Sequence, residues 1–250
     1  MNTAAHLILA MADDALILGH RNSEWTGIGP FLEEDLAFSS MAQDKIGHAQ
    51  ALYALLHSRH GAADPDTLAF LREEKDMRCC HLVELPIGEY DFSIVRHYLF
   101  DKLEWLRYDD LAKSADDELA RLARKVRGEV KYHVMHANTW MRQLAQGNEE
   151  SKARIQSSLQ LHWNIALGMF EPLEGEEELV EQGLFSGHSL LFDQWMSAVA
   201  ADLSAWGLKL PETNLANMEK GGRRGYHTEY LQSLLEEMGE VIRSESGAEW

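Results

Sequence analysis

The spacing of proline between long helical patterns constrains the fold of this chain more than any other feature. Only five prolines occur among 250 residues, and each falls where an amphipathic pattern starts or stops. Between them, apolar side chains recur every three to four residues, the period of one helix face, and no block alternates as a half-buried strand would. Helices are therefore expected over about 3–24, 31–60, 66–79, 92–114, 116–146, 149–171, 187–207 and 228–244.

Long amphipathic helices joined by short connections are typical of an antiparallel, all-α bundle. No Ser-, Gly- or Pro-rich linker divides the chain, so we expect a single domain over residues 1–250. Gly19 and Gly47 fall inside two of the expected helices. A missing side chain at these positions indicates close approach of neighbouring helices.

The composition excludes several classes of function. The formal net charge is −18, from 41 acidic and 23 basic residues, and this charge argues against binding to nucleic acid or to an anionic membrane. The first residues lack a basic segment and are interrupted by Asp13 and Asp14, so neither a signal peptide nor an anchor is expected. The two cysteines, Cys79 and Cys80, are adjacent, which disfavours a disulfide. We therefore expect a cytoplasmic protein.

Charged side chains interrupt the apolar seams of three expected helices. Within 116–146, Glu129 and His133 continue the stripe that Leu119 and Val126 begin. Burying such groups is costly unless they pair with one another or bind a metal. We therefore predict a buried polar cluster, and its members are Glu34, Asp44, His48, Asp101, Lys102, Glu104, Glu129 and His133.

Carboxylates and imidazoles between helices suggest a di-iron centre, which takes a Glu-x-x-His pair from each of two helices. None of the twelve histidines has an acidic residue three positions earlier. Asp44 precedes His48 by four residues, as Glu129 precedes His133, and this step also keeps both side chains on one helix face. We interpret the cluster as a degenerate di-iron-like site with no metal and no catalytic residue, in which Lys102 neutralises carboxylates.

A basic, glycine-rich segment, KGGRRGYHTE at 220–229, stands out in this acidic chain. Arg223 and Arg224 are candidates for a partner contact or an anion site. The alternative is a loop whose arginines are only solvated. Thr228 is expected to cap the last helix.

Several sequence blocks, taken in their order along the chain, resemble a known family. They are LGHRNSEWTG at 18–27, EEDLAFSSMAQDKIGHAQ at 33–50, DPDTLAFLREE at 64–74, VELPIGEYDFSIVRHYLFD at 83–101, EVKYHVMHANTWMRQLAQG at 129–147 and GGRRGYHTEYLQSLLEEM at 221–238. The chain resembles the C-subunit family of bacterial phenylacetyl-CoA epoxidases from about residue 13 to Trp250, and least over about 172–210.

The resemblance implies a ferritin-like helical bundle with additional C-terminal helices. It also implies a non-catalytic, structural subunit of the multicomponent enzyme that epoxidises the ring of phenylacetyl-CoA during aerobic phenylacetate catabolism, using dioxygen and NADPH. In that family the homologous A subunit holds the di-iron centre, and a reductase carries flavin and iron–sulfur groups. The implied partners are the A subunit, a small B subunit and the reductase, with self-association when the chain is alone.

Two other functions stay open at this point. One is an autonomous di-iron oxidase or oxygenase, which would use Asp44, His48, Asp101, Glu104, Glu129 and His133. The other is a stand-alone binding or storage protein of the same fold. The missing three-residue motif weighs against the first, and the family resemblance along the chain weighs against the second.

Overall fold

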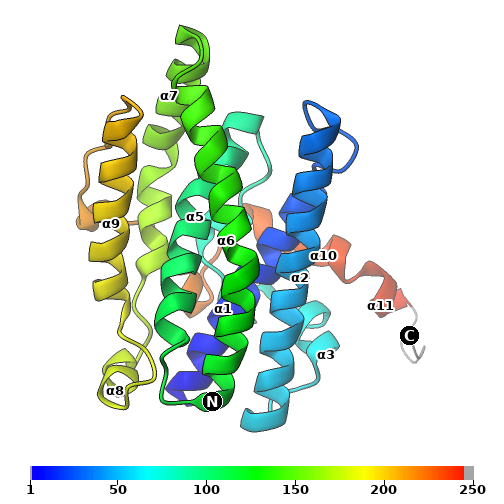
Figure 1. Cartoon of the computed structure of the whole chain (residues 1–250). Coiled ribbons are helices and arrows are strands. Elements are labelled where there is room, and N and C mark those ends of the chain that lie inside the picture. Colours follow the sequence, from blue (N-terminus) through cyan, green and yellow to red (C-terminus); the bar gives the residue numbers. More distant parts are fainter. Residues whose placement is uncertain (1, 245–250) are drawn as a thin grey trace. The chain divides into compact units, whose positions relative to one another are not determined.

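The computed structural model of the chain describes residues 2–244. All regular elements among these residues are helices, without a strand (Figure 1). The fold is therefore all-α, as predicted, and is consistent with a ferritin-like bundle. By their contacts the residues form two compact units, unit 1 from Met1–Pro86 with Gly221–Trp250, and unit 2 from Ile87–Lys220. The expected single domain stays a prediction.

Unit 1 is built on two long helices, α1 (Thr3–Ser23) and α2 (Leu32–His60), which pack along each other (Figure 1). The side chain of Asn2 caps α1 by accepting a hydrogen bond from the backbone N–H of Ala5. A Cβ atom on Gly19 of α1 would lie only 2.9 Å from the Ile46 side chain of α2, which confirms the close approach predicted there. The same prediction is wrong for Gly47, where a Cβ would meet nothing within 4 Å.

The remaining elements of unit 1 are short. They are α3 (Pro65–Phe70), the 3₁₀ turn η1 (Glu74–Asp76), α4 (His81–Glu84), the 3₁₀ turn η4 (Gly222–Arg224), α10 (Glu229–Met238) and α11 (Glu240–Ser244).

The predicted helix over 66–79 is wrong beyond Phe70, and the reason lies in buried carboxylates on α1. The backbone N–H of Arg78 donates to Asp13 over 2.7 Å, and that of Cys80 donates to Asp14 over 2.8 Å. Because these N–H groups bind side chains of another element, they are not used within a helix of their own.

Unit 2 is organised around α5 (Tyr90–Leu111), which contacts α6 (Asp117–Ala145), α7 (Glu149–Leu167) and α9 (His188–Ala205). Since three helices cover α5, most of its residues are buried, including its charged ones. The indole rings of Trp163 and Trp195 stack with their centroids 5.4 Å apart. The shorter elements are η2 (Gly168–Phe170), α8 (Glu176–Glu181) and η3 (Leu215–Asn217).

The long helices of both units end within four residues of their predicted limits, apart from 228–244, which is divided into α10 and α11. Caps explain this agreement in part, since the side chain of Asp116 accepts from the first turn of α6 and that of Asn148 from the first turn of α7. Among the described helices, none combines the length and the apolar content that crossing a bilayer demands.

Candidate functional site

The highest concentration of buried charge in unit 2 lies on α5. Its buried charged and imidazole side chains belong to Arg96, His97, Asp101, Lys102, Glu104 and Arg107. Asp101 and Glu104 are three residues apart, so they share one face of the helix. Burial of this many ionisable groups requires that they interact with each other or with a bound ion.

Three predicted members of the polar cluster come together between α5 and α6. One ligand atom from each of Asp101, Glu104 and His133 lies within 4.8 Å of the other two, and all three side chains are buried. His133 projects from the middle of α6, where the seam predicted from sequence places it. The structure thus brings these three residues together, and their role as a degenerate di-iron-like cluster stays a prediction.

A fourth polar residue, His97, belongs to the same group and was missed. Its Nδ1 lies 2.8 Å from Oδ2 of Asp101, and both side chains are fully buried. The pair is separated by one helical turn, with the acid after the histidine. A search for acidic residues only on the N-terminal side of each histidine cannot find this order.

The other predicted members occupy different positions. Glu129 is half-buried on α6, in unit 2. On α2, in unit 1, Glu34 and His48 are buried and Asp44 is half-buried. That these four residues join Asp101 and its neighbours in one cluster stays a prediction.

The predicted role of Lys102 differs from the contacts that its side chain makes. Its Nζ donates to Oδ2 of Asp202 on α9 over 2.7 Å and lies 5.0 Å from the centre of the Tyr98 ring. The ion pair that the structure gives Lys102 is thus with a partly exposed carboxylate of α9, and the expectation that it neutralises the clustered carboxylates of α5 is not met.

The donor set of α5 and α6 differs from that of a di-iron centre. A Glu-x-x-His pair starting at Glu129 would need its histidine at position 132, which is an exposed tyrosine. The corresponding position after Glu104 is Arg107, whose cationic side chain is buried. A permanent cation in place of a neutral ligand opposes metal binding. The residues of this helix pair therefore do not fit the two-iron arrangement.

In unit 1, sequence reasoning missed two buried ion pairs on α1. Asp13 pairs with Arg72 and accepts a hydrogen bond from the Tyr53 hydroxyl over 2.6 Å. Asp14 accepts two hydrogen bonds from the Arg223 guanidinium, each 2.8 Å long. The two acidic residues that interrupt the apolar N-terminal segment thus hold distant parts of unit 1 together.

These contacts change the interpretation of the basic segment. Arg223 is buried, whereas Arg224 is exposed. Arg223 is therefore not placed for the predicted surface contact, and such a contact stays a prediction for Arg224 alone. Thr228 occupies the N-cap position of α10 as predicted, but its hydroxyl donates to Glu84 and makes no cap hydrogen bond.

Comparison with known proteins decides the family. The profile of the family described as "Phenylacetic acid catabolic protein" matches residues 1–250. The chain belongs to this family. Within it, the chain is similar to the C subunit of 1,2-phenylacetyl-CoA epoxidase from Escherichia coli (strain K12), with 30% identity over 250 residues that cover the whole of both chains. The resemblance seen in the sequence blocks is thus confirmed.

Proposed function

We propose that this phenylacetic acid catabolic protein is the structural, non-catalytic C subunit of a phenylacetyl-CoA 1,2-epoxidase and pairs with the di-iron A subunit in the cytoplasm. The observation that carries the proposal is the full-length similarity to a protein named as the C subunit of that enzyme. The iron, flavin and iron–sulfur groups then reside in the A subunit and the reductase.

The polar group of α5 and α6 supports the non-catalytic part of the proposal. Asp101, Glu104 and His133 converge as remnants of a ligand set would, but Arg107 and Tyr132 stand where paired histidines would follow the acids. An oxygenase of this class needs two irons bridged by carboxylates. The chain therefore keeps the buried polar seam of such a bundle and leaves the redox chemistry to its partner.

We expect the purified, full-length chain to contain no stoichiometric iron. After expression in iron-rich medium, elemental analysis of the chain alone and of the chain co-expressed with the A subunit gives the iron content of each. All the iron in the complex should follow the A subunit. Two irons per copy of this chain would instead favour the autonomous di-iron oxidase, for which the convergence of Asp101, Glu104 and His133 is the supporting observation.

An exposed apolar patch in unit 1 supports the pairing. The exposed fractions are 61% and 42% for Ile28 and Phe31, which precede α2, and 68% and 62% for Leu32 and Leu36 in its first turns. Leu32 and Leu36 are one turn apart and so share a helix face. Groups of exposed apolar side chains often mark protein–protein contacts, and a permanent subunit interface buries on the order of 2,000 Å² or more. We assign this patch to the A subunit.

The double change Leu32→Lys and Leu36→Lys should weaken binding to the A subunit by at least about tenfold, since desolvating a lysine at an apolar interface is unfavourable. Calorimetric titration measures the effect. Leu161→Lys is the matched control, because Leu161 is 74% exposed on α7 and lies outside the patch. Equal affinities for the double variant and the control would show that the patch is not the contact.

A further inference from the structure

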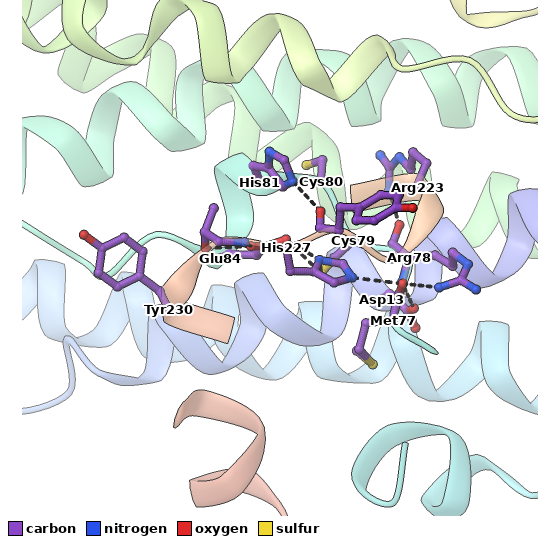
Figure 2. A network of polar contacts seen from close by, with 12 residues as sticks. Asp13, Met77, Arg78, Cys79, Cys80, His81, Glu84, Arg223, His227 and Tyr230 are labelled. Atoms are coloured by element: carbon purple, nitrogen blue, oxygen red, sulfur yellow. Dashed lines mark hydrogen bonds and ion pairs between the residues drawn. The ribbon is translucent and has the colours of Figure 1, made fainter. Parts of the chain in front are cut away.

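Three side chains from separate segments of unit 1 meet at one buried point (Figure 2). Cys79 lies between η1 and α4, Glu84 is the last residue of α4, and His227 lies between η4 and α10. The Cys79 Sγ is 3.6 Å from Oε1 of Glu84 and 4.0 Å from Nδ1 of His227. Nδ1 and Oε1 are 2.7 Å apart. A thiol, a carboxylate and an imidazole thus face one another at this point.

The size of this triangle suits a small metal ion. Given these three separations, one point lies about 2 Å from all three atoms, which matches Zn–N and Zn–O bonds and is within about 0.3 Å of a Zn–S bond. A shift of a few tenths of an ångström in the Cys79 side chain would complete the fit. Three protein ligands leave one position for water, as in many zinc sites.

The surrounding hydrogen bonds orient each ligand as metal sites require. Nε2 of His227 lies 3.1 Å from the backbone oxygen of Met77, so it carries a proton and leaves Nδ1 to face Cys79 and Glu84. Metal-bound histidines commonly donate their second N–H to a backbone carbonyl in this way. Oε2 of Glu84 accepts from both the N–H and the hydroxyl of Thr228, each over 2.7 Å, which turns Oε1 toward the other two ligands.

With a divalent ion bound, the site would hold a thiolate, a carboxylate and a neutral imidazole, since metal ligands must be deprotonated. The neighbouring acids already have cationic partners, because Asp13 is paired with Arg72 and Asp14 with Arg223. The nearby His81 ring is held by the backbone oxygen of Tyr226.

We propose that Cys79, Glu84 and His227 form a binding site for one thiophilic divalent metal ion, with Zn²⁺ as the physiological candidate. Borderline-soft ions select this mixture of sulfur, nitrogen and oxygen donors. Because His227 belongs to the C-terminal part of unit 1 and the other two ligands to the part before α5, the ion would tie the two segments together and stabilise unit 1.

Titration of the untagged, reduced, full-length chain with Co²⁺ tests the site, since cobalt bound by a thiolate gives a near-ultraviolet charge-transfer band. One equivalent of Co²⁺ should produce the band, and Zn²⁺ should remove it. Cys79→Ser should lose the band and bind at least about 100-fold more weakly. Cys80→Ser is the matched control and should behave as the unaltered chain, because the Cys80 thiol lies outside the group.

A second measurement keeps the test valid if Cys79→Ser does not fold. In the unaltered chain, Zn²⁺ should slow alkylation of Cys79 at least about tenfold relative to Cys80, as judged by mass spectrometry of the two labelled thiols. The absence of a thiolate band in the folded, unaltered chain would overturn the proposal. So would a band that persists in Cys79→Ser, or metal bound only at Asp101, Glu104 and His133.

Discussion

Arg223→Glu should lower the free energy of unfolding by at least about 3–5 kcal/mol, the usual cost of removing one partner of a buried ion pair. The Arg223 guanidinium is bound by both oxygens of Asp14 and also donates to the backbone oxygen of Arg78 over 2.7 Å. A glutamate at this position would leave Asp14 without its cation and would add a second buried negative charge. The change should also disturb the backbone at Cys80, because its N–H donates to Asp14.

Arg224→Glu is the matched control for this prediction, because it makes the same charge change at the next, exposed position. Its effect should stay within about 0.5 kcal/mol, as is usual for surface substitutions. Urea denaturation of the full-length chain, followed by circular dichroism, measures both variants. If the two variants unfolded at the same urea concentration, the Asp14–Arg223 pair would not contribute as described.

Gly225→Ala should lower the free energy of unfolding by nearly as much, for two separate reasons. Gly225 has a φ of +83°, in the left-handed region where a side chain costs roughly 1–2 kcal/mol. A Cβ atom at this position would also lie 2.2 Å from the backbone oxygen of Lys75, a distance that only movement of the main chain can relieve. We therefore expect the free energy of unfolding to fall by more than about 3 kcal/mol, in the range of overpacked core positions.

Gly61→Ala separates these two contributions. Gly61 follows α2 with a φ of +64°, but a Cβ there would meet nothing within 4 Å. This variant should show only the conformational cost of about 1–2 kcal/mol. Comparing the urea midpoints of the two variants isolates the contact with Lys75. If Gly225→Ala lost no more stability than Gly61→Ala, the segment after η4 would not be packed this closely.

The long helices were predictable because their signals are local. Proline, capping residues such as Asp116, and a period of three to four residues act within a few turns. The short α4 and the backbone of Arg78 and Cys80 were not predictable in this way. Their geometry depends on Asp13 and Asp14, more than 60 residues earlier in the chain, and side chains so distant in sequence leave no local pattern.

The candidate site was predictable to a similar extent. The apolar seam of 116–146 led to His133, because burial follows from helix periodicity. Asp101 and Glu104 were expected only to flank the seam of 92–114, and the structure brings them to His133. Lys102 lies in the same seam, yet its long side chain reaches Asp202 on α9. Periodicity gives the face of a helix and not the end point of a flexible side chain. The surface position predicted for Arg223 was wrong for a related reason, since a glycine-rich basic segment resembles a solvated loop in sequence.

The central claim is that this chain serves as the structural partner of a catalytic A subunit. Its most direct test is a calorimetric titration of the purified, full-length chain with the A subunit from the same organism, supported by size-exclusion chromatography of the mixture. We predict a saturable complex with a Kd below about 1 μM, equivalent to more than about 8 kcal/mol of binding free energy. A chain that stays separate from the A subunit at micromolar concentrations would contradict the account.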